Sequence, residues 1–320
     1  MMNYLNTYRR YACDLDRIND EAKHNAADFI QMTEKVFRHE LRLIAEQIMN
    51  MSSDNHIILL SGPSGSGKTT SAKKLADEFR KNNVDVQVIS MDDFYLGIDN
   101  ICRTEDGKPD FECVEALDIP LIQKCIRELA ETGRCIIPKY DFTVSRRSSV
   151  TREIKLNHNS VIIMEGIHAL NPIFSCGMPK DKIIKIYVSV KQGIKSNEDY
   201  ILTNRDIRFL RRMVRDYSFR KVAPENMLAM WPTVCDGEYK YIRPYRYTSD
   251  FTVNSIHIYE PCVMKDIALN LLTKIEKNIA EREFAERLIT SLMKFESIDS
   301  SLIPENSLIR EFIGGGCYIY

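Results

Sequence analysis

The residues best suited to do chemistry are 62 to 69, which read GPSGSGKT and complete the pattern G-x-x-x-x-G-K-[ST]. Glycines let the backbone N–H groups of such a loop approach phosphate oxygens, Lys68 supplies a charge for the β- and γ-phosphates, and Thr69 supplies a hydroxyl ligand for Mg²⁺. An apolar run precedes the loop and a helical apolar pattern follows it, which a chance Gly/Ser-rich turn would not require. The nucleotide contacts predicted here are Gly62, Pro63, Ser64, Gly65, Ser66, Gly67, Lys68, Thr69 and Thr70.

A pair of carboxylates, Asp92 and Asp93, follows the second apolar run, 86 to 90. A hydroxyl that attacks a γ-phosphate must lose its proton, and an aspartate within hydrogen-bond reach can accept it. Because side chains alternate along an extended chain, only one of the pair is expected to be this base. The alternative, in which the pair caps the next helix, would explain Asp93 but leave Asp92 unused.

A third carboxylate, Glu165, ends the apolar run 161 to 164 as the acidic residue of a Walker B strand does, with Glu in place of the more usual Asp. Glu165 is the expected partner of Mg²⁺, directly or through water. Gly166 lets the chain turn close to the site, while His168 either contacts the substrate or satisfies a hydrogen bond at the strand end. The carboxylates and the loop together predict phosphoryl transfer.

An arginine-rich segment, 205 to 221, carries apolar residues at helical spacing and predicts a helix with one packed and one cationic face. Such a helix can form a lid, about 198 to 247, that excludes water and brings guanidinium groups to the phosphoryl group during transfer. The alternatives are a solvated basic helix balanced by Asp206 and Asp216, and a nucleic-acid-binding helix. The net charge of −1 and the lack of interleaved stacking residues disfavour the latter. The arginines are Arg205, Arg208, Arg211, Arg212, Arg215 and Arg220.

Continuous apolar runs alternate with helical patterns from residue 56 onward, which predicts strands that are buried on both faces and joined by helices. The expected fold is α/β, a P-loop parallel sheet wrapped by helices, with ligand sites at the carboxyl ends of its strands. The predicted strands are 57–60, 86–90, 135–138, 161–164, 183–190 and 251–255, and the predicted helices are 67–83, 116–132, 205–221, 261–283 and 284–295.

Three parts are predicted along the chain: a helical N-terminal extension (1–55), a kinase domain (56–275) and a helical C-terminal tail (276–320). The extension contains an apolar stripe that predicts one long amphipathic helix, with a shorter helix before it. Its apolar face either packs against the chain's own domain, which is the commoner arrangement, or binds a second copy or another partner. The stripe consists of Phe29, Met32, Val36, Phe37, Leu41, Ile44 and Ile48.

The composition of the chain limits its possible partners and its compartment. The 320 residues carry a net charge of −1, so no global charge favours nucleic acid or a membrane as the partner. Nine cysteines, an odd number without a C-x-x-C pair, argue against a disulfide framework or a zinc site and favour a reducing compartment. The N-terminus lacks an apolar h-region, and no run approaches the roughly eighteen apolar residues of a membrane span. A cytoplasmic protein is expected, and a homo-oligomer remains open.

Five motifs together resemble one family. The segments GPSGSGKTT, SMDDFY (90–95), PKYDF (138–142), VIIMEGIHALNP (161–172) and RDIRFLRRMVRD (205–216) are similar to those of the uridine kinase and phosphoribulokinase family. They look closest to the bacterial uridine-kinase-like nucleoside kinases. The resemblance runs from about 56 to 275, and the ending IPENSLIREFIGGG also resembles that bacterial group.

The resemblance implies a role for each matching position. Asp92 corresponds to the general base, Glu165 to the metal-associated carboxylate, and Arg212 and Arg215 to phosphate-contacting lid arginines. In uridine-cytidine kinases a His follows the Y-D-F motif and helps to read the pyrimidine, whereas this chain has Thr143 there. The residues implied to contact the acceptor are Tyr95, Phe111, Glu112, Tyr140, Phe142, Arg147 and His168; Glu112 stands where those enzymes have a ribose-binding Asp.

The function expected from these observations is ATP- and Mg²⁺-dependent phosphorylation of a nucleoside 5′-hydroxyl, with uridine or cytidine as first candidates. An alternative keeps the fold and changes the acceptor to another small alcohol, such as a sugar phosphate, for which Arg146 and Arg147 offer cations, or pantothenate. An alternative of another class is an ATP-binding regulator, in which the N-terminal helix contacts a protein partner.

Overall fold

A parallel five-stranded sheet forms the centre of the computed structural model, which describes residues 13–51, 56–104, 107, 109–141, 144–157, 160–178, 182–275 and 281–319. The strand order is β11-β8-β1-β7-β2, and every neighbouring pair is parallel. The strands are β1 (His56–Ser61), β2 (Asp85–Ser90), β7 (Ser160–Glu165), β8 (Ile183–Ser189) and β11 (Phe251–Asn254). The predicted α/β sheet wrapped by helices is confirmed.

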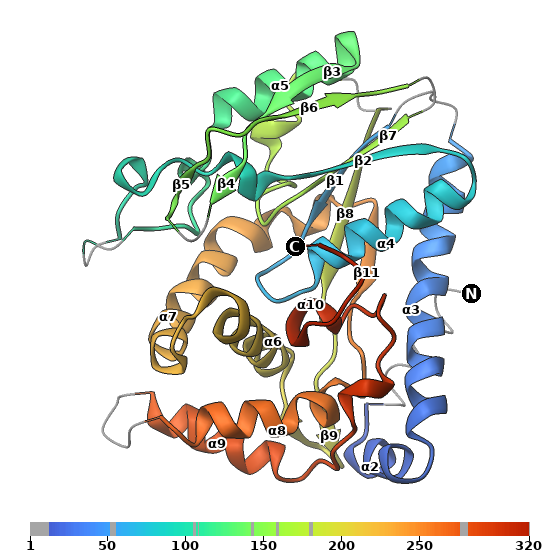
Figure 1. Cartoon of the computed structure of the whole chain (residues 1–320), viewed down its shortest axis with the longest axis vertical. Coiled ribbons are helices and arrows are strands. Elements are labelled where there is room, and N and C mark those ends of the chain that lie inside the picture. The colour runs from blue at the N-terminus through green and yellow to red at the C-terminus, as the bar shows by residue number, and fades with distance from the viewer. Residues whose placement is uncertain are drawn as a thin grey trace.

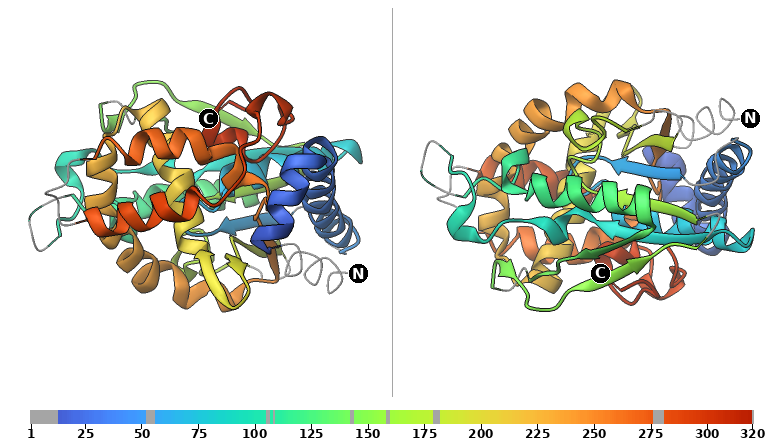
Figure 2. Two further views of the ribbon diagram at one scale, coloured as in Figure 1. Left: turned by 90° about the horizontal axis from the view of Figure 1, so that it is seen from below. Right: turned by 90° about the horizontal axis from the view of Figure 1, so that it is seen from above.

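Helices cover both faces of this sheet because its strands are apolar on both faces. Ile58 and Leu60 of β1 point into the larger core, whereas Ile57 and Leu59 point into a second core that includes α5 (Ile119–Thr132). The larger core is built by α4 (Lys68–Lys81), α6 (Asn204–Arg220), α7 (Pro224–Gly237), α8 (Glu260–Leu272) and α9 (Arg282–Leu292), among others. Figures 1 and 2 show α5 and the α8–α9 pair at opposite ends of the molecule.

The N-terminal extension forms a short helix, α2 (Leu15–His24), followed by a long one, α3 (Ala26–Met49), as predicted. α3 runs beside α4 and contacts β11 (Figure 1). Most of the predicted stripe is buried in the larger core, so the apolar face packs against its own chain. Met32 is an exception, since its side chain is 50% exposed. Residues 1–12 and 52–55 of the extension lie outside the described residues.

The apolar run 135–138 is not a strand of the central sheet, which corrects the prediction. It forms β3 (Arg134–Ile137), which pairs antiparallel with β6 (Arg152–Lys155) in a separate two-stranded sheet. Cys135 and Ile137 are buried, but Ile136 is 61% exposed. The run therefore alternates like a half-buried strand, and periodicity over four residues does not distinguish this from a fully buried one. The other short pairs are β4 (Tyr140–Asp141) with β5 (Arg146–Arg147), and β9 (Ile194–Ser196) with β10 (Asp199–Leu202).

A disulfide joins Cys102 and Cys113, a bridge that the cysteine pattern of the sequence did not predict. The segment between them folds back on itself, because the Asp110 N–H donates to the Cys102 carbonyl at 2.8 Å. The two cysteines are 11 positions apart, a spacing without a recognisable signature. Among the helices that the structure describes, none is long and apolar enough to cross a bilayer.

The C-terminal tail returns to the phosphate loop after α9. Its last part contains only short helical turns, including α10 (Arg310–Ile313), and α10 packs against α6. Figure 1 shows this red segment beside α4. The tail therefore lies at the carboxyl edge of the sheet, where parallel strands place their ligand sites.

Candidate active site

The phosphate loop joins β1 to α4 and depends on two glycines with positive φ. Gly65 has φ +73° and Gly67 φ +80°, which other residues adopt only with strain. A Cβ atom on Gly65 would lie 2.6 Å from the Arg208 carbonyl oxygen, so the close packing of α6 also requires glycine. The Ser66 hydroxyl is buried inside the loop without a hydrogen-bond partner among the described residues. Such an unsatisfied donor suits a bound phosphate oxygen.

Two buried arginines of α6 hold the loop carbonyls. Arg208 donates to the Ser64 carbonyl and Arg211 to the Gly65 carbonyl, each at 3.2 Å. Their charges are paired with carboxylates, Arg208 with Glu238 at 2.6 Å and Arg211 with Glu260 at 2.5 Å. Both were predicted to lie on a cationic face, but they are 3% and 0% exposed. The two arginines therefore stabilise the backbone of the phosphate loop through its carbonyl groups.

Three oxygen-bearing side chains meet where β1, β7 and β2 end. The Thr69 hydroxyl donates to Glu165 Oε1 at 3.2 Å, and the Ser90 hydroxyl donates to the same oxygen at 2.8 Å. Strand register explains the meeting, because Leu60 and Ser90 are both paired with Glu165 across β7. Adjacent ligands of an octahedral Mg²⁺ at about 2.1 Å lie roughly 3 Å apart, so Thr69 and Glu165 fit this ion.

Burial strongly affects the charged groups at this edge of the sheet. It raises the pKa of Glu165 to about 7, with the nearby Asp92 carboxylate adding to the rise and Lys68 opposing it. Burial also lowers the pKa of Lys68, while Glu165 and Asp92 oppose that change. The three predicted residues therefore form one electrostatic cluster. Perturbed buried groups of this kind are typical of active sites.

The two neighbouring aspartates have different surroundings. They lie on a 3₁₀ turn, Met91–Phe94, rather than on the extended segment that the sequence predicted. Asp93 Oδ1 accepts a hydrogen bond from the Tyr140 N–H at 3.3 Å, which ties it to the adjoining loop. The negative charge of Asp92 instead raises the pKa of Lys68 and that of Glu165. Of the pair, Asp92 is the one placed with the phosphate loop.

The two predicted phosphate-contacting arginines reach the site from α6. Arg212 donates to the Ser64 hydroxyl at 2.8 Å and lies 3.8 Å from Glu112. Arg215 pairs with Asp216 at 2.7 Å and lies 4.0 Å from Glu311. The helix itself is packed in the core through Ile207, Leu210, Met213 and Val214. Movement of the segment 198–247 as a lid stays a prediction.

Aromatic side chains predicted to line the acceptor pocket come together beside Asp92. The ring centroids of Tyr95 and Phe111 are 5.7 Å apart, and those of Tyr95 and Tyr140 are also 5.7 Å apart. The Tyr95 hydroxyl donates to the Phe111 carbonyl at 3.1 Å, which fixes the two segments relative to each other. Phe142 lies outside the described residues.

The polar residues predicted for the same pocket differ from one another in their surroundings. Burial raises the pKa of Glu112, although Arg212 opposes the change. Burial lowers the pKa of His168 to about 4, and its ring is edge-on to Tyr241 at 6.3 Å. Arg147 donates to the Phe94 and Tyr95 carbonyls at 3.1 Å and pairs with Asp118 at 3.0 Å. In this structure Arg147 therefore positions the segment that carries Tyr95.

Two residues of the site had no place in the sequence analysis. Ser90 directly precedes the aspartate pair, and its position at a strand end is a signal that could have identified it. Glu311 accepts hydrogen bonds from Thr70, 241 residues away, and nothing local in the sequence indicates this contact.

Comparison with known proteins shows the family to which the chain belongs. A sequence model of the Phosphoribulokinase / Uridine kinase family matches residues 57–260. The uridine kinase of Lactobacillus johnsonii is 28% identical over 205 residues, 63% of this chain and 88% of that protein. The uridine kinase of Saccharomyces cerevisiae is 29% identical over 262 residues, 80% of this chain and 46% of that protein. A solved phosphoribulokinase from Rhodobacter spheroides is 18% identical with a TM-score of 0.43, over 62% of this chain and 69% of its own. Because the family model covers more than half of the sequence, this chain belongs to the phosphoribulokinase / uridine kinase family and is an ATP-dependent small-molecule kinase.

Proposed function

We propose that this kinase phosphorylates the 5′-hydroxyl of a nucleoside, with uridine and cytidine as first candidates. The observation that carries the proposal is the position of Asp92 between two sites. It acts electrostatically on Lys68 of the phosphate loop, and it lies three residues before Tyr95 of the aromatic cluster. A flat nucleobase offers two faces for contact with such rings. The bacterial relative named uridine kinase supports the same acceptor class.

The chain's own residues suffice to assign the steps. Thr69 and Glu165 would hold Mg²⁺, and the bound ion would supply positive charge to the phosphate groups of the nucleotide. Asp92 accepts the proton of the acceptor hydroxyl. Positive charge for the transferred group comes from Lys68, with Arg212 and Arg215 supplying more from α6. Exclusion of water from this cluster would come from closure of the predicted lid over it.

Recognition of the ribose is assigned to Glu112. Its side chain is 14% exposed, and its carboxylate lies 3.8 Å from the guanidinium of Arg212, which holds it near the loop. A carboxylate accepts hydrogen bonds from two vicinal hydroxyls. Glu112 therefore favours an acceptor with a free 2′,3′-diol.

A sugar phosphate is a less favoured acceptor because the cations it would need have other partners. Arg146 pairs with Asp99 at 2.9 Å, and Arg147 pairs with Asp118 at 3.0 Å. An acceptor phosphate would have to compete with both carboxylates. This leaves the neutral nucleoside as the better match.

An acceptor screen tests the proposal. Release of ADP from MgATP is measured with uridine, cytidine, purine nucleosides, 2′-deoxyuridine, sugar phosphates and pantothenate. We expect turnover with a pyrimidine ribonucleoside and a lower kcat/KM with 2′-deoxyuridine. Turnover with a sugar phosphate or pantothenate, and none with nucleosides, would overturn the acceptor assignment. Identification of the product as a nucleoside 5′-monophosphate completes the test.

A further inference from the structure

A carboxylate from the C-terminal tail binds to the first turn of α4. Glu311 Oε2 accepts a hydrogen bond from the Thr70 N–H at 3.2 Å and another from the Thr70 hydroxyl at 2.5 Å. The free N–H groups at the start of a helix, with the positive end of its dipole, form an anion site. In a phosphate loop this is the site that nucleotide phosphates use. Here an anion of the chain itself occupies it.

The surroundings show that this contact is enclosed. Thr70 is fully buried and Glu311 is 7% exposed. Arg215, expected to contact the transferred phosphate, lies 4.0 Å from the same glutamate. Glu311 thus contacts a backbone donor at the start of α4 and lies 4.0 Å from a cation of α6, as a phosphate group would.

The tail also lies directly against the loop. A Cβ atom on Gly67 would be 2.7 Å from a methyl carbon of Leu308, so the leucine side chain fills the space next to the glycine. Leu308, Ile309 and Phe312 belong to the larger core and anchor the tail on both sides of Glu311. Apolar packing therefore holds the backbone in place, whereas the Glu311 side chain itself is held by polar contacts.

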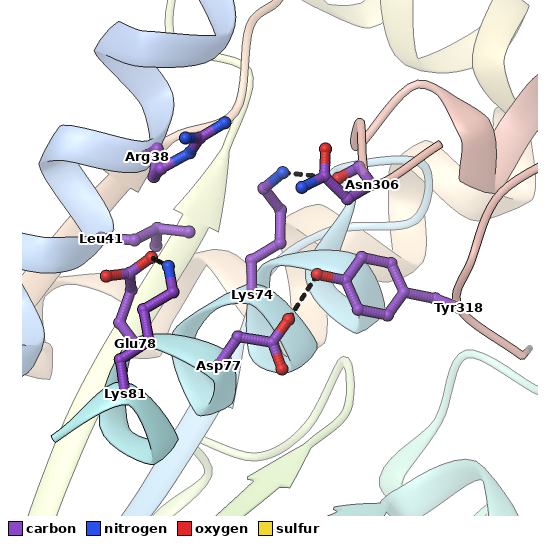
Figure 3. A pocket seen from close by; sticks show the side chains of 8 residues that line it. All are labelled: Arg38, Leu41, Lys74, Asp77, Glu78, Lys81, Asn306 and Tyr318. Carbon is purple, nitrogen blue, oxygen red and sulfur yellow. Dashed lines mark hydrogen bonds and ion pairs between the residues drawn. The ribbon is translucent and has the colours of Figure 1, made fainter. Parts of the chain in front are cut away.

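Further contacts fix the tail to the outer side of α4. Lys74 donates to the Asn306 carbonyl at 2.5 Å, and Tyr318 donates to Asp77 at 2.6 Å (Figure 3). These residues border a cavity of about 90 Å³ that also touches Arg38 of α3. The tail thus packs along α4, and Asn306 and Tyr318 line one cavity with Arg38 of α3.

We propose that Glu311 is an internal substitute for a nucleotide phosphate, and that a nucleotide must displace its carboxylate from Thr70 in order to bind. Two anions do not share one site at this distance, since like charges in a buried site repel strongly. Nucleotide affinity is then reduced by the fraction of molecules in which Glu311 occupies the site. The inference requires only that the loop binds a nucleotide, and it is independent of the acceptor.

Calorimetric titration with MgADP, without any acceptor, tests this inference. Glu311→Gln keeps the shape of the side chain but removes its charge, so we expect MgADP to bind about tenfold tighter than to the wild type, the scale of a charged hydrogen bond. Glu305→Gln is the matched control, because Glu305 lies in the same tail but is exposed. The control is expected to bind MgADP as the wild type does.

Unchanged or weaker MgADP binding by Glu311→Gln would overturn the proposal, because Glu311 would then support the nucleotide rather than compete with it. If that variant fails to fold, Glu311→Asp serves the same purpose, since its shorter side chain keeps the charge but withdraws it from Thr70. Thermal unfolding supplies a second readout: saturating MgADP should raise the Tm of Glu311→Gln more than it raises the Tm of the wild type. A kinase that binds MgADP as expected but does not phosphorylate nucleosides would contradict the acceptor assignment alone.

Discussion

The Thr69 hydroxyl lies 3.2 Å from the Glu165 carboxylate, although 96 residues separate them in the chain. The parallel pairing of β1 with β7 brings them together, because Leu60 is in register with Glu165 and the phosphate loop follows Leu60 by one residue. The metal site is therefore a consequence of sheet topology. The Glu165 carboxylate of this site is also costly to bury, so it lowers the stability of the protein while it supports activity.

Glu165→Gln should inactivate the enzyme and stabilise the nucleotide-free protein. The folded-state pKa of Glu165 is raised from 4.5 to about 7. Its favourable contribution is thus complete below about pH 4.5 and is lost as pH rises through about 7. A neutral amide avoids this loss, so we expect the variant to be more stable than the wild type by about 1–3 kcal/mol at pH 8 and nearly equal at pH 4.5. Thermal unfolding without Mg²⁺ measures this difference.

The activity of the same variant is measured as kcat at saturating MgATP. We expect a loss of about 100-fold or more, because a metal-associated carboxylate is missing. Glu153→Gln is the control, since Glu153 is exposed on β6 and should change neither property. A stability difference that does not grow between pH 4.5 and pH 8 would contradict the shifted pKa.

Asp92→Asn should separate chemistry from nucleotide binding. The amide cannot accept the hydroxyl proton, so kcat should fall by about 10²–10⁴-fold. MgATP binding, measured by calorimetry, should stay within about threefold of the wild type. Asp93→Asn is the matched control, because Asp93 accepts a hydrogen bond from the Tyr140 N–H and an amide oxygen can still accept it. Near-normal turnover of Asp92→Asn would exclude Asp92 as the base.

Phe37→Ala should destabilise the whole protein, because the N-terminal extension is part of its core. Phe37 is fully buried, and its ring lies 5.0 Å from that of His257. Removing a buried phenylalanine costs about 3–5 kcal/mol. Met32→Ala, on the exposed side of the same helix, should change the free energy of unfolding by less than about 0.5 kcal/mol. Equal effects of the two variants in urea titrations would contradict this packing.

Local patterns account for what the sequence predicted correctly. The five strands of the central sheet, the phosphate loop and the positions of Asp92 and Glu165 each follow from a run of neighbouring residues, and the structure brings them together as parallel pairing requires. The prediction for the short run 135–138 was wrong because a four-residue apolar segment fits a central strand and an edge strand equally well.

The features of the site that the sequence did not predict depend on contacts between residues far apart in the chain. The link between Thr70 and Glu311 depends on how the tail folds back, which no periodicity records. Arg208 and Arg211 were predicted to lie on the cationic face of the helix because arginine counts as polar in any helical pattern. Their burial depends on carboxylates from α8 and from the turn after α7, which become partners only in the folded chain.

Arg211→Met should be among the most destabilising changes in the protein. Arg211 and Glu260 are both 0% exposed and form two hydrogen bonds, at 2.5 and 2.8 Å. Loss of the arginine leaves a buried carboxylate unpaired, which costs about 3–5 kcal/mol. Arg205→Met is the control, since Arg205 is exposed on the same helix and its loss should cost less than about 0.5 kcal/mol.

A double variant separates the role of Arg211 in stability from its role in the phosphate loop. Arg211→Met combined with Glu260→Met removes the unpaired charge, so the free energy of unfolding should recover by at least about 1 kcal/mol relative to Arg211→Met. MgADP affinity should not recover, because the Gly65 carbonyl still lacks the hydrogen bond that Arg211 donates. Calorimetric titration of both variants at a temperature where each is folded makes the comparison. Full recovery of MgADP affinity in the double variant would show that Arg211 serves the ion pair alone and not the loop.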